Sequence, residues 1–235
     1  MKTNKIINAD CLEFMATLPD GCIDLILTDP PYLINYKTSY RQNKKHKFCS
    51  SIANDNNPEL TAMYIRECYR ILKNNTAMYM FCSPDKIDYF KQEIEKYFKL
   101  KNIIIWVKNN HTAGDLEAQF GKKYEMILYA NKGQAKINGK RHTDIWRYNR
   151  VAGNEQLHQN QKPVALLSRA IESHSNIGDI VFDGFIGSGS TLVAAERLGR
   201  YWIGVELSAK YCNIARERIH RERNGRLFDP YEEEI

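Results

Sequence analysis

Residues 180–191 read IVFDGFIGSGST, and Leu192 to Leu198 then forms an apolar run that Gly199 closes. This order of an apolar run, a turn with three glycines and a second apolar run predicts a strand, a turn and a helix. Backbone N–H groups at such a helix start, together with the helix dipole, favour an anionic group. The segment therefore predicts an α/β fold with an anion site, although its spacing departs from the Gly-x-Gly-x-x-Gly fingerprint.

A second strand is expected at Tyr201 to Val205, and it ends in Glu206. An acidic residue at this place in a nucleotide-binding half can accept hydrogen bonds from a ribose diol. Asp183, Gly187, Gly189 and Glu206 together predict an adenosine-bearing cofactor. The alternative is an ordinary α/β core that binds nothing.

The sequence Asp29-Pro30-Pro31-Tyr32 follows the apolar run Ile23 to Leu27. A strand of an open α/β sheet would carry these four residues into the crevice at its carboxyl end. Asp29 and the Pro30 carbonyl can each accept a hydrogen bond from an exocyclic amine, and Tyr32 can stack on the ring that bears it. The competing interpretation is a proline-rich turn.

Apolar runs and helical periodicities alternate along much of the chain. A helix opened by Asn57-Pro58 should place Leu60, Met63, Tyr64, Ile71 and Leu72 on one face. The other expected elements are strands at 5–9, 23–28, 76–82, 103–107, 124–130, 180–182 and 201–205, and helices at 12–18, 87–98 and 192–198. The pattern predicts a doubly wound, mostly parallel, Rossmann-like sheet in a single domain over residues 1–235.

Composition narrows the class of protein further. The 235 residues are 43% hydrophobic and 26% charged, without an apolar run of membrane-spanning length or an N-terminal signal peptide. We therefore expect a soluble, cytoplasmic protein. The six cysteines are scattered and the histidines are not clustered, so we expect reduced thiols and no metal site.

Two basic segments interrupt the α/β rhythm of a chain whose net charge is +6. The insertion at 36–57 carries the basic residues Lys37, Arg41, Lys44, Lys45 and Lys47 among aromatic side chains. These residues suit DNA phosphates and bases, while the alternative is a solvated loop. The second excursion, Asn131 to Gln161, is a candidate target-recognition segment.

The tetrapeptide at Asp29, the later glycine-rich turn and the Gln161-Lys162-Pro163 run resemble the β class of N6-adenine DNA amino-methyltransferases, which use S-adenosylmethionine. The likeness runs from Lys5 to about Arg223. It implies a catalytic site of Asp29, Pro30, Pro31 and Tyr32. It also implies cofactor contacts by Asp10, Cys11, Lys162, Pro163, Asp183, Phe185, Gly187, Ser188, Gly189, Ser190, Thr191 and Glu206. Gly184 departs from the family, which has proline or a larger apolar residue there.

The resemblance implies direct methyl transfer to the N6 amine of a flipped adenine in DNA. N4-cytosine methylation is the first alternative, and an RNA or protein amide methyltransferase is the second. A nicotinamide-dependent oxidoreductase would leave the Asp29 tetrapeptide unexplained, and a DNA-binding module without activity would leave both pockets unexplained. DNA is the expected partner, with a homodimer and a cognate restriction endonuclease also considered, in a bacterial, archaeal or phage-encoded protein.

Overall fold

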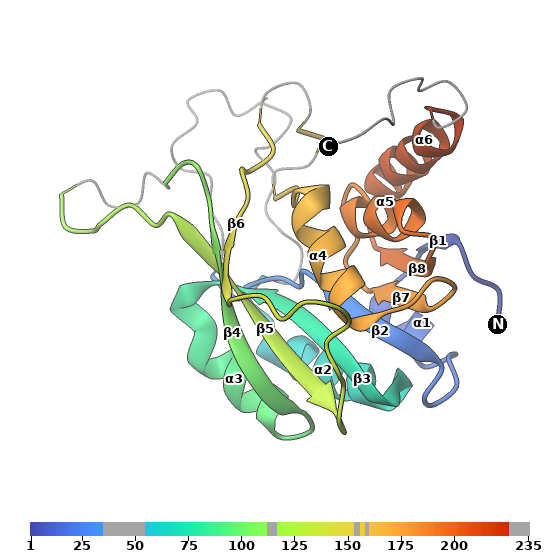
Figure 1. The fold of residues 1–235 in the computed structure, drawn as a ribbon, viewed down its shortest axis with the longest axis horizontal. Helices are drawn as coiled ribbons and strands as arrows, with labels where there is room; N and C mark the ends of the chain where they lie inside the picture. The colour runs from blue at the N-terminus through green and yellow to red at the C-terminus, as the bar shows by residue number, and fades with distance from the viewer. Residues whose placement is uncertain (35–54, 112–116, 153–155, 158–159, 226–235) are drawn as a thin grey trace.

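The computed structural model describes residues 1–34, 55–111, 117–152, 156–157 and 160–225. In this part of the chain the strands form one eight-stranded sheet in the order β1-β8-β7-β2-β3-β5-β4-β6 (Figure 1). The strands are β1 Lys5–Asn8, β2 Ile23–Thr28, β3 Leu72–Cys82, β4 Lys99–Val107, β5 Tyr124–Lys132, β6 Ile145–Arg147, β7 Ile180–Asp183 and β8 Tyr201–Glu206. Strand β5 runs antiparallel to β3 and β4, and the other neighbouring strands are parallel. The predicted mostly parallel sheet is confirmed.

Helices cover both faces of the sheet, as a doubly wound fold requires. One core cluster contains α1 Cys11–Met15, α2 Pro58–Ile71 and α3 Ile87–Glu95, which follows the short 3-10 helix η1 Pro84–Lys86. The other contains α4 Val164–His174, α5 Ser190–Arg197 and α6 Ala209–Gly225. In Figure 1, α4 lies in front of the strands and α2 is seen behind them. None of the described helices is long and apolar enough to cross a membrane.

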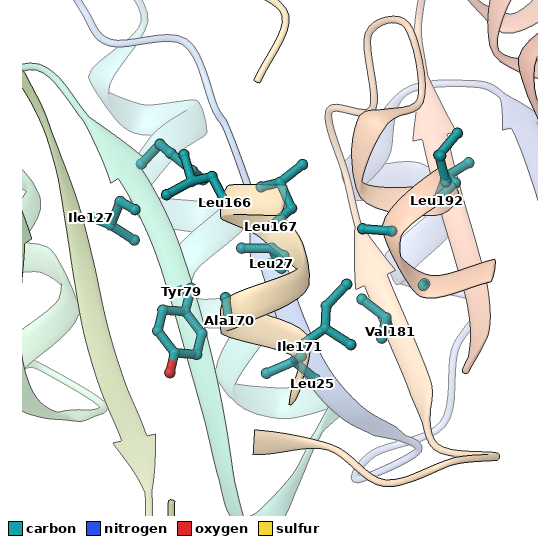
Figure 2. Close-up of a cluster of buried hydrophobic side chains, with 14 of the residues drawn as sticks. Leu25, Leu27, Tyr79, Ile127, Leu166, Leu167, Ala170, Ile171, Val181 and Leu192 are labelled. Carbon is teal, nitrogen blue, oxygen red and sulfur yellow. The ribbon is translucent and has the colours of Figure 1, made fainter. Parts of the chain in front are cut away.

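Strand β2 shows why the strands read as continuous apolar runs. Leu25 and Leu27 belong to the cluster under α4, whereas Ile26 belongs to the cluster on the opposite face. Figure 2 shows Leu25 and Leu27 beside Leu167 and Ile171 of α4. Because both faces are covered, every residue of β2 except Asp24 is buried, and little polar alternation remains.

Helix α2 begins as expected but ends differently. The Asn57 side chain accepts a hydrogen bond from the Leu60 N–H at 3.1 Å, which confirms the predicted N-cap. Two of the five residues predicted for its buried face are wrong. Met63 is 43% exposed, and Leu72 is the first residue of β3, which is longer than expected. Leu72 is buried as a strand residue, a position that apolar periodicity does not distinguish from a helical one.

Lys132 does not belong to the basic excursion in which the sequence placed it. It is the last residue of β5, and its ammonium donates hydrogen bonds to the carbonyls of Tyr69 (2.6 Å) and Leu72 (2.7 Å). The lysine therefore caps the C-terminal end of α2, where carbonyl groups lack partners and the helix dipole favours a cation. The same excursion also contains β6, which pairs with β4.

His174 at the end of α4 is held between two tyrosines. Its Nδ1 lies 2.7 Å from the Tyr79 hydroxyl, and its Nε2 lies 2.8 Å from the Tyr129 hydroxyl. Burial lowers the pKa of His174 to about 4 from an ordinary 6.5. The folded protein therefore holds the imidazole neutral at pH values where the unfolded chain would bind a proton.

This difference predicts acid sensitivity. Below pH 6.5 the unfolded chain binds a proton at His174 that the folded protein does not. The free energy of unfolding therefore falls by up to about 3 kcal/mol as the pH drops from 6.5 toward 4. Urea unfolding between pH 7.5 and 4 should show a steeper loss of stability for the wild type than for His174→Gln. Because both proteins share every other titrating group, the difference between their slopes isolates His174, and equal slopes would contradict the prediction.

Candidate active site

A pocket of about 910 Å³ opens at the carboxyl ends of the central parallel strands. It lies where β2 and β7 are neighbours. From β7 the chain continues to β8 on one side, and from β2 it continues to β3 on the other, which is where open α/β sheets bind ligands. Of the predicted site residues, those lining it are Asp10, Cys11, Asp29, Pro30, Pro31, Tyr32, Lys162, Asp183, Phe185, Gly187, Ser188, Ser190, Thr191 and Glu206. Pro163 and Gly189 are not in the lining. Instead, each is the N-cap residue of a helix, of α4 and α5 respectively.

Asp29 leaves the end of β2 with both carboxylate oxygens engaged. The Tyr32 hydroxyl donates to Oδ1 at 2.5 Å, and the Lys162 ammonium lies 2.7 Å from Oδ2. Burial raises the pKa of Asp29, and the charge of Lys162 opposes that rise. The Tyr32 ring is thus tethered by its hydroxyl in this structure.

Lys162 joins Asp29 to a second carboxylate that sequence reasoning did not assign to the site. Its Nζ lies 3.1 Å from Glu125 Oε2 and donates to the Tyr32 hydroxyl at 3.0 Å. Glu125 also receives the Lys108 ammonium, at 3.1 Å from Oε1. Although burial raises the pKa of Glu125, the two ammonium groups bring it down to about 2. The sequence does carry a signal for these two residues, since each is a charged residue at one end of an apolar strand. Lys108 follows the last residue of β4, and Glu125 is the second residue of β5.

The glycine-rich turn has the backbone that its sequence predicts. Gly187 and Gly189 have φ of 50° and 81°, in the left-handed region that favours glycine. A Cβ at Gly189 would lie 2.9 Å from Cβ of Ala215 in α6. The turn therefore needs glycine at Gly189 both for its conformation and for its close approach to α6.

Two carboxylates flank this turn. Glu206 accepts hydrogen bonds from the N–H groups of Gly187 at 3.0 Å and Ser208 at 2.8 Å. Asp183 accepts from the Phe185 N–H at 3.0 Å, and burial raises the pKa of Asp183 to about 7. A pocket with an acidic acceptor and a tight glycine turn fits an adenosine-bearing cofactor.

Arg218 of α6 is a supporting residue that the sequence did not reveal. Its guanidinium donates to the Ser190 hydroxyl at 2.9 Å and to the Ser188 carbonyl at 3.2 Å. Burial lowers the pKa of Arg218 to about 10. Helix α6 therefore braces the glycine-rich turn from outside the pocket.

Tyr64 accounts for the unusual Gly184. A Cβ at Gly184 would lie 2.6 Å from the Tyr64 ring and hydroxyl, so the tyrosine occupies the space of a larger residue 184. The Tyr64 hydroxyl accepts from the Gly184 N–H at 3.2 Å and lies 2.8 Å from the Thr28 hydroxyl. Glycine at position 184 therefore leaves room for the Tyr64 ring beside the glycine-rich turn.

Asp10 and Cys11 reach the pocket from the start of α1. The Asp10 carboxylate caps that helix by accepting from the Leu12 N–H at 2.8 Å. Burial raises the pKa of Cys11 to about 12, so its thiol is not a nucleophile. Among the described residues, no group of histidine, cysteine and acidic side chains could hold a metal ion. The predicted DNA-contacting residues Lys37, Arg41, Lys44, Lys45 and Lys47 lie outside the described residues.

Comparison with known proteins identifies the family. The N6_N4_Mtase family, described as DNA methylase, matches residues 23–217. Over 219 residues the chain is 33% identical to the putative methylase YubD of Escherichia coli (strain K12), covering 92% of this chain and 90% of that protein. It is also 29% identical over 249 residues to the type II methyltransferase M.HinfI of Haemophilus influenzae, covering 92% and 68%. The chain belongs to this family of DNA methylases.

Solved structures agree with this assignment. The complex of M1.HpyAVI with SAM has a TM-score of 0.66 and 30% sequence identity, and covers 91% of this chain and 98% of that one. The PvuII DNA methyltransferase, which is cytosine-N4-specific, has a TM-score of 0.75 at 17% identity, with 95% and 92% covered. At that identity the second likeness shows the fold alone.

Proposed function

We propose that this DNA methylase transfers a methyl group from S-adenosylmethionine to the exocyclic N6 amine of adenine. The observation that carries the proposal is the Asp29 carboxylate, which stands in the same pocket as the glycine-rich turn and Glu206. Aspartate at the first position of the tetrapeptide resembles adenine enzymes, whereas related cytosine enzymes more often carry serine. N4-cytosine methylation is the closest alternative, because both amines are planar and donate two hydrogens.

The cofactor is S-adenosylmethionine, in agreement with the sequence-based prediction, the family and the SAM complex of M1.HpyAVI. When bound, this cofactor supplies an electrophilic methyl group on a sulfonium. We assign Glu206 to its ribose hydroxyls, and Asp183 together with the turn from Phe185 to Thr191 to its methionine part. Asp10 and Cys11 would contact its adenine. Lys162 lines the pocket, and its ammonium lies 2.7 Å from Asp29.

The residues of the tetrapeptide would act on the target amine. An aromatic amine is a poor nucleophile because its lone pair is delocalised into the ring. Asp29 and the Pro30 carbonyl can accept its two hydrogens, which draws the lone pair back to nitrogen and aims it. Such orientation can contribute about 7 to 11 kcal/mol. Pro31 lacks an N–H that would compete for these acceptors.

The target base must leave the duplex to reach Asp29, at a cost of a few kcal/mol. Tyr32 would then provide replacement stacking. Its hydroxyl is bonded to Asp29 in this structure, so base entry has to exchange that hydrogen bond for one from the amine. The exchange keeps Asp29 supplied with a donor throughout.

The choice of base can be measured directly. DNA methylated by the protein is digested to deoxynucleosides. We expect mass spectrometry to find N6-methyldeoxyadenosine and no methyldeoxycytidine. Methylcytidine alone would overturn the adenine assignment and leave the fold and cofactor intact. Offering labelled cofactor with RNA or protein in place of DNA tests the remaining alternatives in the same assay.

DNA contacts are proposed for the insertion at 36–57 and for the excursion at 131–161. In the second segment the exposed basic side chains are Lys136, Lys140, Arg141, Arg147 and Arg150. Arg150 also lines the pocket, which connects this segment to the site of chemistry. A second copy of the chain and a restriction endonuclease remain predictions about partners.

The first of these segments can be tested by salt dependence. If Lys44 and Lys45 contact phosphates, replacing both with alanine should reduce the slope of log K against log salt by about two. The matched control replaces Lys99 and Lys101, exposed residues near the start of β4 and at the opposite end of that strand from the pocket. An unchanged slope in the Lys44 and Lys45 variant would favour the alternative interpretation, a solvated loop that does not contact DNA.

A further inference from the structure

We propose that Lys162 is a positioning residue for methyl transfer, and that its pairing with both Asp29 and Glu125 allows Asp29 to take up a proton and release it within each cycle. The inference rests on the proposed function, because it treats Asp29 as the residue that meets the target amine. It adds a role for two residues that lie beneath the tetrapeptide.

Lys162 is a buried lysine whose ammonium contacts two carboxylates. The Lys162 side chain is 7% exposed, and its ammonium lies 2.7 Å from Asp29, 3.1 Å from Glu125 and 3.0 Å from the Tyr32 hydroxyl. The ring of Phe81 lies below it, with 4.9 Å between Nζ and the ring centroid. A buried ammonium with this many fixed partners is held in one place and fixes the orientation of Asp29.

Glu125 explains how Asp29 can change charge inside a buried cluster. If Lys162 had Asp29 as its sole partner, protonating Asp29 would leave an unpaired buried cation, which is strongly unfavourable. Glu125 remains ionised beside Lys162, because Lys108 holds its other oxygen at 3.1 Å. Lys162 therefore keeps a partner in both charge states of Asp29.

The reaction then balances within this cluster. The nitrogen lone pair of the amine forms the new N–C bond, and the electron pair of the broken C–S bond stays on sulfur, which becomes a neutral thioether. The surplus proton on the amine nitrogen passes to the Asp29 carboxylate and from there to water. Lys162 stays protonated throughout, and no side chain forms a covalent bond.

The charged and titratable groups around Asp29 determine in which direction each substitution shifts its pKa. Burial raises its pKa, Lys162 lowers it, Glu125 raises it, and the Tyr32 hydrogen bond lowers it. Asp183 and Cys82 also face this cluster, and burial raises the pKa of each of these two side chains. Removing Lys162 must raise the pKa of Asp29, whereas removing the charge of Glu125 must lower it.

The first test is the pH dependence of single-turnover methyl transfer to DNA, counted as total label so that the identity of the base does not matter. In Lys162→Met the acid limb should move up by about one pH unit or more, and in Glu125→Gln it should move down. Lys162→Arg should return the limb toward its wild-type position. Lys101→Met, which removes an exposed lysine of β4, is the matched control and should leave the limb in place.

A merely structural role for Lys162 would lower the rate at every pH without moving the limb. That result, or a shift of both variants in the same direction, would overturn the proposal. Calorimetry with S-adenosylmethionine separates this role from cofactor binding, since we expect Lys162→Met to change cofactor affinity by less than about threefold. A large loss of affinity would assign Lys162 to the cofactor instead.

The second test needs no activity. Carboxyl-labelled aspartate is titrated by NMR in the free protein, with the Asp29 signal identified by its loss in Asp29→Asn. The signal should titrate at higher pH in Lys162→Met and at lower pH in Glu125→Gln, and an unmoved titration would refute the charge pair. If the wild type methylated no DNA, the proposed function would fail while this titration still decided the pairing.

Discussion

Replacing Asp29 with alanine is expected to lower methyl transfer at least about a hundredfold while cofactor affinity stays within a few-fold of wild type. Under the proposed function Asp29 meets the target amine, whereas Glu206 and the glycine-rich turn, which line the same pocket, contact the cofactor. Lys162 retains Glu125 as a partner, so the variant should fold. Single-turnover rates with labelled cofactor, together with calorimetry, measure the two quantities separately.

Asp29→Asn is the matched control for shape. It keeps one oxygen acceptor and the side-chain volume but removes the charge that Lys162 holds. We expect it to fall between the alanine variant and wild type in rate, with cofactor affinity unchanged. Transfer by Asp29→Ala within a few-fold of wild type would remove Asp29 from the chemistry.

Replacing Glu206 with alanine should have the opposite profile, with cofactor affinity falling at least about tenfold. Hydrogen bonds to a charged group contribute roughly 1.5 to 3 kcal/mol, and the carboxylate also anchors the Gly187 and Ser208 N–H groups. Loss of the side chain should therefore remove the proposed ribose acceptor and leave these two N–H groups without it. Calorimetric titration with S-adenosylmethionine gives the affinity.

Glu217→Ala serves as its control, because this glutamate lies on α6 with 71% of its side chain exposed. It should leave the affinity unchanged. Saturating cofactor should restore most of the transfer rate of Glu206→Ala, since Asp29 and its partners are untouched. Unaltered affinity in Glu206→Ala would count against the ribose assignment.

The parts of this protein that sequence reasoning predicted are those whose physical cause is local. Buried strands such as β2 are apolar runs because both of their faces are covered. The turn at Gly187 and Gly189 shows itself because left-handed backbone favours glycine. Together they place the pocket, since the carboxyl ends of adjacent parallel strands must meet.

What the sequence did not reveal depends on distant contacts. Helix α6 went unassigned because its buried residues are few, namely Cys212, Ala215 and Ile219, and charged neighbours surround them in the sequence. Lys162 and Asp29 are far apart in the chain, so no spacing indicates that they form an ion pair. The same holds for Tyr64, whose ring fills the space beside Gly184.

The pairing of β1 with β8 has a consequence for how the protein is made. Asn8 and Glu206 are paired although 198 positions separate them, and residues at or just beyond the carboxyl ends of both strands line the pocket. A ribosome synthesises the chain from its N-terminus, so β1 cannot pair with β8 until β8 has emerged. The Asp29 segment is synthesised early, but β8 and Glu206 must follow before the pocket is complete. A chain that has not yet reached β8 lacks Glu206 and the partner strand of β1, so under the proposed function it cannot yet hold its methyl donor.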